Sequence, residues 1–188
     1  RTRLVGSEMC IRDRGIEAVK SSTPAPCRTM IKDALKLMMR GTEDDVIEFI
    51  ENARKEFKSL PPEEIAFPRT ASNVQKYKSS SDIYVKGTPI HIRGALLFNY
   101  YLRKKKLTNK YSAIENGEKI KFLYLKKPNT IQENVLSFIQ DFPTEFGLSQ
   151  YIDYELQFEK SFVYPLKAIL DAIGWEVEKK VTLESFFS

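Results

Sequence analysis

The sequence predicts an α+β fold that is mostly helical, with a few short strands. Apolar residues recur at helical spacing in several long segments, whereas strand-like alternation marks only one segment clearly. No internal repeat and no Gly-rich phosphate-binding loop interrupts this pattern. The 188 residues, of which 42% are hydrophobic and 12% aromatic, are enough to bury a core.

The N-terminal third predicts two helices joined by a short link. Thr23 can cap the first helix, Pro24 suits its first helical position, and Gly41 suits its exit. Thr42 can cap the second helix, and Asp45, three residues later, is typical of a capping box. Because the link is short, we expect an antiparallel pair. The expected buried residues are Ile31, Ala34, Leu35 and Met38 in the first helix and Val46, Phe49, Ile50, Ala53 and Phe57 in the second.

The middle of the chain predicts loops, one helix and one strand. Residues 65–86 indicate short elements and loops, and residues 89–106 predict a helix with a basic exit. Cations at a helix C-terminus oppose the negative end of the dipole, which gives them a structural role. Residues 117–125 alternate between apolar and basic side chains after the Asn116-Gly117 turn, so we expect a strand there.

The C-terminal part predicts further helices. Residues 133–142 predict a short helix. Residues 149–175 predict a largely helical segment, in which Pro165 forces a kink or a restart because proline lacks a backbone N–H.

Charge is unevenly distributed along the chain. Residues 76–127 contain 13 Lys or Arg and three acidic residues, a net charge of +10, and the remainder carries −5. A polyanionic partner and a solvated Lys-rich surface both fit this basic block. No apolar run approaches a membrane span in length, so no membrane partner is expected. Cys10 and Cys27 lack metal-ligand spacing, and we expect a reducing compartment.

Most enzyme templates do not fit this sequence. His91 is the only histidine, which excludes His-based metal sites and Ser-His triads. The carboxylate pairs Asp44-Asp45 and Glu63-Glu64 lie at expected helix starts, where the helix dipole explains them. We therefore predict no catalytic residue and no metal ligand in these 188 residues.

Three short segments are typical of contacts with a nucleic-acid backbone. Residues 20–24 place a lysine and hydroxyl groups at a helix N-terminus, where backbone N–H groups can receive a phosphate. Residues 72–78 mix amides, lysines and a tyrosine, and residues 91–94 put a histidine and an arginine in the first turn of a helix. The structural alternatives are Ser22 and Thr23 as caps, Tyr77 as a core residue and His91 as a packing residue.

The opening 14 residues have no apolar periodicity. Within them, SEMCIRDR resembles translated sequencing-adapter sequence, and a genuine upstream segment of a longer polypeptide is the alternative. We therefore treat residues 1–14 as a non-native segment outside the fold.

Six segments, in this order, resemble the C-terminal part of the replicative family B DNA polymerases of tailed bacteriophages. They are GIEAVKSSTP, SNVQKY, PIHIRG, NGEKIKFLYL, FEKSFVYPL and EKKVTLESFF, and they run from Gly15 to Phe187. The resemblance implies a polymerase thumb domain over residues 15–176 and a sliding-clamp-binding tail over residues 177–188. It also implies a longer parent nucleotidyltransferase whose palm domain holds Mg²⁺, in the cytoplasm of an infected bacterial host, because the palm's aspartates have no counterpart here.

In that family the thumb grips the newly formed duplex across its minor groove and phosphate backbones. Such a grip is neutral to sequence, because Lys and Arg displace counterions from phosphates and few base edges are read. Tyr164 departs from the family, which tends to carry a basic residue at that position. Carried over by position, the residues implied to face DNA are Lys20, Ser21, Ser22, Asn73, Lys76, Lys86, His91, Arg93, Lys119 and Lys160.

The expected tail contains an apolar plug. Leu183, Phe186 and Phe187 fall at i, i+3 and i+4, so one helical turn brings them together. The resemblance implies that this plug fills a hydrophobic pocket on the phage sliding clamp, and folding back onto its own domain is the alternative. The implied partners are therefore primer-template duplex, the clamp and the parent's palm domain. A non-catalytic accessory protein that binds DNA and a sliding clamp is the second function that fits.

Overall fold

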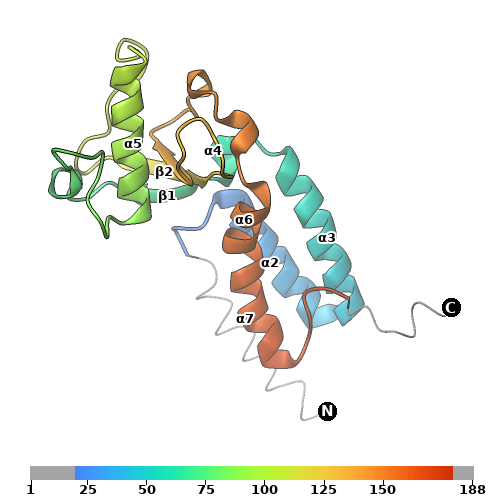
Figure 1. Cartoon of the computed structure of the whole chain (residues 1–188). Helices are drawn as coiled ribbons and strands as arrows, with labels where there is room; N and C mark the ends of the chain where they lie inside the picture. The colour runs from blue at the N-terminus through green and yellow to red at the C-terminus, as the bar shows by residue number, and fades with distance from the viewer. Residues whose placement is uncertain (1–19, 180–188) are drawn as a thin grey trace. The chain divides into compact units, whose positions relative to one another are not determined.

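The computed structural model describes residues 20–179, which form two compact units (Figure 1). The helical unit comprises the described residues 20, 25–59 and 158–179, and the sheet unit comprises residues 21–24 and 60–157. Their elements confirm the predicted α+β class, mostly helical with a small sheet. In the described range, no helix is both long and apolar enough to cross a membrane. The adapter-like segment, residues 1–14, lies outside the described residues.

The helical unit begins with the expected antiparallel pair. Helices α2 (Ala25–Arg40) and α3 (Glu43–Ser59) lie side by side, joined by a short link (Figure 1). The capping box is confirmed: the Thr42 N–H donates to Asp45 Oδ2 at 2.8 Å, and the Asp45 N–H donates to Thr42 Oγ1 at 3.3 Å. The expected stripe of α3 is buried except for Phe49, which is half-buried, and Ile47 is buried in addition.

The C-terminal helical segment restarts at the expected proline. Helix α6 (Tyr154–Phe158) is followed by a π-helical turn (η4, Glu159–Val163) and by α7 (Tyr164–Ile173), with Pro165 in the first turn of α7. The Tyr164 N–H donates to the carbonyl five residues back, at Glu159. Proline cannot donate a hydrogen bond and conflicts with the carbonyl of the preceding turn, and we attribute the wider turn before it to that conflict.

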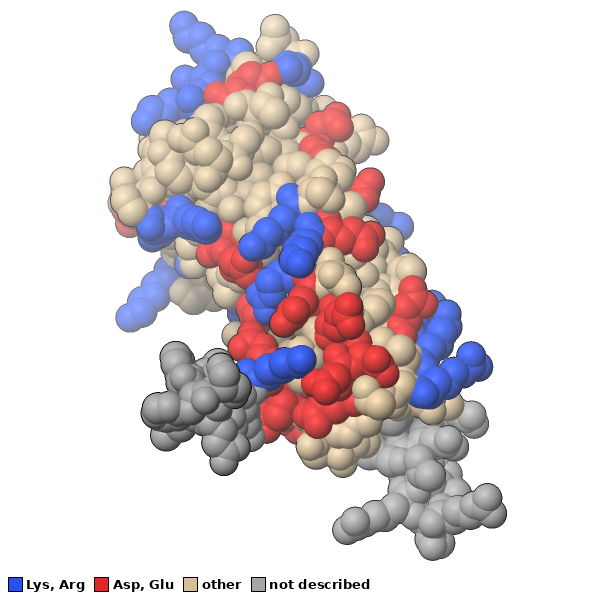
Figure 2. All heavy atoms as spheres, turned by 90° about the vertical axis from the view of Figure 1, so that its right-hand side faces the viewer, with Lys and Arg blue, Asp and Glu red and all other residues tan. Residues whose placement is uncertain are grey.

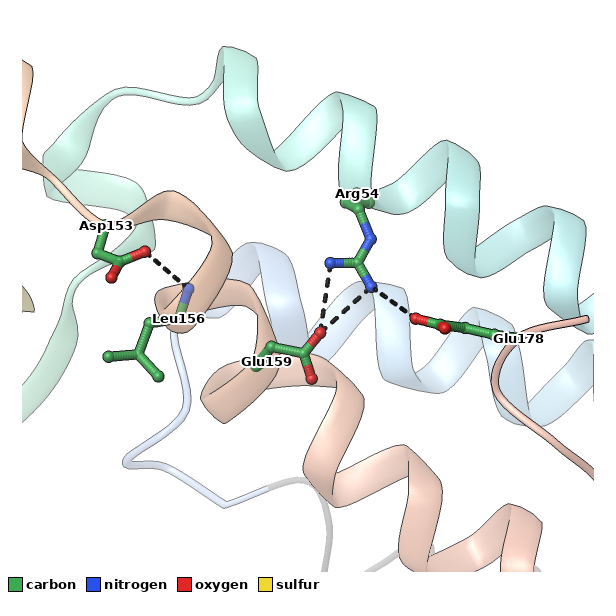
Figure 3. Close-up of polar contacts among 5 residues, drawn as sticks. All are labelled: Arg54, Asp153, Leu156, Glu159 and Glu178. Atoms are coloured by element: carbon green, nitrogen blue, oxygen red, sulfur yellow. Dashed lines mark hydrogen bonds and ion pairs between the residues drawn. The ribbon is translucent and has the colours of Figure 1, made fainter. Parts of the chain in front are cut away.

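Aromatic rings form the centre of the helical unit. Phe158 lies 5.2 Å from Phe57 and 5.0 Å from Phe162, measured between ring centroids. Arg54 of α3 covers this cluster, with its guanidinium carbon 5.0 Å from the centroid of Phe158. Its guanidinium also contacts Glu159 at 3.2 Å and Glu178 at 3.8 Å, and so joins α3 to both segments (Figure 3).

The sheet unit contains three antiparallel strands in the order β1-β2-β3. These are β1 (Phe67–Thr70), β2 (Lys119–Tyr124) and β3 (Val135–Phe138). The predicted strand is thus confirmed as β2, and the predicted basic helix as α5 (Ile90–Lys104), which packs on β3. Asp153 begins α6 by accepting a hydrogen bond from the Leu156 N–H at 3.1 Å (Figure 3). The remaining short elements of the unit are α4 (Pro62–Ile65), η1 (Val74–Tyr77), η2 (Thr144–Phe146) and η3 (Ser149–Tyr151).

The prediction of a short helix over residues 133–142 is wrong, because its centre forms β3. All four residues of β3 are buried, so the strand shows none of the apolar–polar alternation that marks a half-exposed strand. Helix α5 covers it closely: a Cβ atom added at Gly94 would lie 2.4 Å from Ser137 Oγ. The glycine in this helix therefore serves the contact between α5 and β3.

Candidate nucleic-acid interface

An open groove of about 620 Å³ lies in the sheet unit beside β1 and β2. Its walls combine cationic side chains and hydroxyl groups with a larger share of apolar surface, and none of its lining residues is acidic. The lining residues are Ser21, Ser22, Pro68, Arg69, Thr70, Lys119, Ile120, Lys121 and Ile139.

The register of β1 and β2 places two lysines of the groove. Lys119 and Lys121 are two residues apart on β2, so their side chains leave the same face of the sheet. Thr70 is the register partner of Lys119. Lys121 is half-buried, and its Nζ donates to the Glu63 carbonyl at 2.9 Å, which fixes its position. Lys119 is exposed, so its ammonium group is accessible to an anion.

Arg69 joins the segment of residues 21–24 to the sheet. Its Nη1 donates to the Ser22 carbonyl at 3.2 Å and to the Pro68 carbonyl at 2.9 Å. Its guanidinium carbon lies 5.8 Å from the ring centroid of Phe122, where the ring face attracts a cation. These contacts hold the Ser21 and Ser22 hydroxyl groups at the groove, next to a guanidinium with five N–H donors.

Three of the residues expected to face DNA, Ser21, Ser22 and Lys119, meet in this groove. Asn73 and Lys76 follow the end of β1 and are both exposed. The Asn73 N–H donates to Asn116 Oδ1 at 2.5 Å, just before β2 begins, so this segment continues along the same pair of strands. Three of the ten expected residues therefore line the groove, and Asn73 and Lys76 lie beyond the end of β1.

His91 is half-buried near the sheet, 6.4 Å from Phe122 between ring centroids. Burial, and then the positive charge of Arg69, lower the pKa of His91 below its ordinary value of 6.5. The imidazole is therefore neutral at pH 7 and supplies no positive charge to a phosphate. The position of His91 therefore fits a packing residue, and it equally fits a residue that contacts a ligand through hydrogen bonds.

Arg93 and Lys86 differ in how they are held. Arg93 Nη2 donates to Asn134 Oδ1 at 2.6 Å, and the guanidinium carbon lies 5.7 Å from the centroid of Tyr84. Its Nε is buried and has no hydrogen-bond partner in the structure. Lys86 is exposed in a turn before Gly87. The structure thus ties Arg93 to its own unit and leaves Lys86 at the surface.

Lys20 and Lys160 belong to the helical unit, whereas the residues that line the groove belong to the sheet unit. Both side chains are exposed, and Lys160 lies in the π-helical turn. Tyr164, the departure from the family pattern, is 55% exposed. The plug residues Leu183, Phe186 and Phe187 lie outside the described residues.

Glu176 and the start of the expected tail contact the start of α3. The Glu176 N–H donates to Glu43 Oε1 at 2.7 Å, and Lys179 pairs with Asp44 at 3.6 Å. Acidic side chains gather over α3 on the face shown in Figure 2, and Glu43, Asp44 and Asp45 form its first turn. This acidic surface disfavours phosphates, whereas none of the residues that line the groove is acidic.

Sequence reasoning missed Arg69, Thr70 and Lys121 as groove residues. Arg69 and Thr70 lie on β1, a four-residue strand inside a segment that indicated only short elements and loops. Lys121 could have been predicted, because it lies two residues from Lys119 on the predicted strand and so shares its face.

The groove is suited to binding anions. Arg69, Lys119 and Lys121 supply charge, and the hydroxyl groups of Ser21, Ser22 and Thr70 can donate hydrogen bonds. Cys27, the one cysteine among the described residues, is buried in the helical unit, and burial raises the pKa of its thiol to about 11, so it is not a nucleophile at pH 7. Within residues 20–179, no group of three or more His, Cys, Asp or Glu could hold a metal ion.

Comparison with known proteins finds similarity to two phage enzymes over nearly the whole chain. The chain is 27% identical over 185 residues to the DNA-directed DNA polymerase of Enterobacteria phage T4. It is 29% identical over 186 residues to the DNA-directed DNA polymerase of Escherichia phage RB69. Each match covers 96% of this chain and 20% of the relative, so the chain spans about a fifth of the length of the curated relatives it matches. No protein-family model matches the chain.

Proposed function

We propose that this chain is the thumb part of a family B phage DNA polymerase and that it grips primer-template duplex by its phosphates. The observation that carries this proposal is the groove, where Ser21, Ser22 and Lys119 meet although they are far apart in the sequence. Arg69 and Lys121 add two further cations there. Similarity to phage DNA polymerases over 96% of the chain supports this function over an independent accessory protein.

The grip works without reading sequence. Lys and Arg side chains neutralise phosphates and release the counterions condensed on the duplex. The binding free energy gained in this way is the same for every base pair. Hydroxyl groups and backbone N–H groups position the phosphates but carry no sequence information. A replicative enzyme needs this neutrality because it must copy any template. Nucleotidyl transfer with Mg²⁺ would be an activity of the parent protein's palm domain, in the cytoplasm of the infected host.

Paired charge removal tests the groove. The variant Lys76→Gln/Lys119→Gln removes one exposed cation from η1 and one from β2, and the matched control Lys32→Gln/Lys55→Gln removes two exposed cations from α2 and α3. Fluorescence anisotropy with a labelled primer-template duplex should show roughly tenfold weaker binding for the first variant. Its slope of log affinity against log salt should also fall by about 2, since each phosphate contact contributes about 0.9.

The control variant should bind duplex within about twofold of the unchanged chain, and both variants should melt at the same temperature. Equal losses in the two variants would mean that net charge alone attracts DNA, and the groove would then have no special role. Binding that is insensitive to salt, or limited to one sequence, would contradict the phosphate grip.

The proposal extends to residues 177–188 as a tether. Leu183, Phe186 and Phe187 would fill a hydrophobic pocket on the phage sliding clamp and keep the polymerase near the primer end. Binding of the tail to the clamp raises the effective concentration of the enzyme at DNA, although the tail itself does not touch the duplex.

A further inference from the structure

The C-terminal end of α5 carries exposed cations outside the groove. We call residues 103–106, Arg-Lys-Lys-Lys, the α5 tip. All four side chains are exposed, and none forms an ion pair with a residue that the structure describes. Lys110 differs, because it pairs with Glu145. The positive charge of the tip is therefore not neutralised within the sheet unit.

The tip is also remote from the groove. Helix α5 has 15 residues and so is about 22 Å long. In Figure 1 its C-terminal end projects away from β1 and β2. A ligand of the tip therefore contacts a surface separate from Lys119 and Arg69.

The backbone at the tip places a lysine where glycine is favoured. The Leu107 N–H donates to the Leu102 carbonyl at 2.9 Å, and the Lys106 N–H donates to the Arg103 carbonyl at 3.1 Å. These two bonds form a Schellman motif, whose C′ residue adopts the left-handed conformation. Lys106 occupies that position with φ 56°. Opposition to the helix dipole explains cations in the last turn, but it does not explain a lysine at a position that glycine fills at lower conformational cost.

An aromatic pair lies beside these cations. Tyr100 and Tyr101 lie edge to face with ring centroids 5.0 Å apart, and Lys104 Nζ lies 5.7 Å from the centroid of each ring. Tyr100 is 37% exposed, and Tyr164 is the other large exposed aromatic residue in the described range. The tip thus combines positive charge that is unpaired among the described residues with a partly exposed aromatic side chain.

We propose that the α5 tip binds single-stranded nucleic acid, with Lys104, Lys105 and Lys106 on phosphates and Tyr100 stacked on a base. Single strands expose the faces of their bases, and proteins that bind them combine basic side chains with aromatic platforms. In a duplex the base faces are stacked against one another, so Tyr100 would have no partner there. This site is independent of the duplex groove.

Charge removal at the tip tests the proposal on the full chain. The probes are a labelled oligothymidylate and a labelled blunt duplex, both measured by fluorescence anisotropy. Lys104→Gln/Lys105→Gln/Lys106→Gln should weaken oligothymidylate binding at least tenfold and leave duplex binding within twofold. Its salt slope on the single strand should fall by about 2, since each contact there contributes about 0.7. The matched control Lys32→Gln/Arg40→Gln/Lys55→Gln removes the same charge from the helical unit and should leave both affinities unchanged.

Two single variants separate binding from folding. Lys106→Gly should raise the melting temperature, because glycine suits φ 56°, and still weaken oligothymidylate binding about threefold. Tyr100→Leu should weaken it about fivefold while leaving the salt slope unchanged, because it removes a stacking surface and no charge.

Three outcomes would overturn the proposal. The first is unchanged oligothymidylate binding in the triple variant. The second is an equal loss for the blunt duplex, which would make the tip an extension of the duplex grip. The third is tip-dependent binding of a polyglutamate peptide without binding of the oligonucleotide, which would assign an acidic protein as the partner. Failure of the groove itself would instead appear as unchanged duplex binding in Lys76→Gln/Lys119→Gln.

Discussion

At the scale of single residues, Gly94 decides how closely α5 approaches the sheet. A Cβ atom at this position would lie 2.4 Å from Ser137 Oγ and 2.7 Å from Ser137 N, both shorter than real Cβ contacts allow. Ser137 is itself buried, and its hydroxyl donates to the His91 carbonyl at 2.7 Å. The helix therefore cannot shift without losing a buried hydrogen bond.

We expect Gly94→Ala to lower the free energy of unfolding by about 1–3 kcal/mol, the usual cost of overpacking. At an exposed helical position the same replacement would stabilise the protein, because alanine is favoured over glycine there by about 1 kcal/mol. Urea denaturation of the full chain measures the change. In a Ser137→Gly background the cost of Gly94→Ala should be smaller, because the hydroxyl is absent, but it should not vanish, because the backbone nitrogen still conflicts with the added Cβ atom. An unchanged denaturation midpoint in Gly94→Ala would contradict the close contact.

The individual site residues show what sequence can and cannot supply. Lys119 was expected to face DNA from the family resemblance, and the structure places it in the groove. Arg69 was missed, since its place depends on hydrogen bonds to the Ser22 and Pro68 carbonyls that no local pattern reveals. His91 lies near the sheet, where burial lowers the pKa of its imidazole. The sequence does not show this effect, because burial depends on tertiary packing.

At the scale of elements, the capping box at the start of α3 links sequence to a pH dependence. Both the N–H and the hydroxyl of Thr42 donate to Asp45 Oδ2. These hydrogen bonds favour the ionised carboxylate and lower the pKa of Asp45 below its ordinary value of 3.8. Because the folded-state pKa is depressed, this contribution to stability is present above pH 3.8 and is lost as pH falls through the lower folded value.

We expect Thr42→Ala to lower the free energy of unfolding by about 1 kcal/mol at pH 7, the typical cost of losing an N-cap. The difference from the unchanged chain should shrink as pH falls below 3.8 and through the lowered folded-state pKa of Asp45. Denaturant unfolding of both proteins at pH 7 and at pH 3 measures this difference in the free energy of unfolding. A difference that stays constant with pH would exclude Asp45 as the pH-sensitive partner of Thr42.

Helices were predictable here, whereas buried strands were not. The amphipathic stripes of α2, α3 and α5 are local signals, and each of these helices lies where the sequence predicts it. In β3, burial of all four residues removes the alternation that identifies strands. The four residues of β1 pair with β2 across some fifty intervening residues, and only tertiary structure shows that pairing.

At the scale of the whole molecule, opposite charges gather on different elements. Three acidic residues open α3 in the helical unit, whereas the groove and the α5 tip of the sheet unit are basic. The region predicted as one domain over residues 15–176 comprises parts of both units. Proposed DNA contacts in the sheet unit and the proposed tether after residue 176 are therefore separable by mutation.

The start of the proposed tether and the residue before it are held to the helical unit. Contacts of Glu176 with Glu43, of Glu178 with Arg54 and of Lys179 with Asp44 all reach α3. Glu178, Lys179 and Asp44 are exposed in these two ion pairs, so the pairs contribute little to stability. A tether that starts from a held point limits the positions that a bound clamp can take.

We expect Phe186→Ala/Phe187→Ala to abolish binding to the sliding clamp and to leave duplex binding unchanged. Burying one phenylalanine contributes about 1.5–3 kcal/mol, so losing two weakens binding by roughly a hundredfold or more. Pull-down and anisotropy on the full chain measure the two affinities. The control Met39→Ala/Tyr164→Ala removes comparable exposed apolar groups from the helical unit and should leave clamp binding intact. If the tail instead packs on its own domain, the phenylalanine variant will lower the melting temperature and clamp binding will not change.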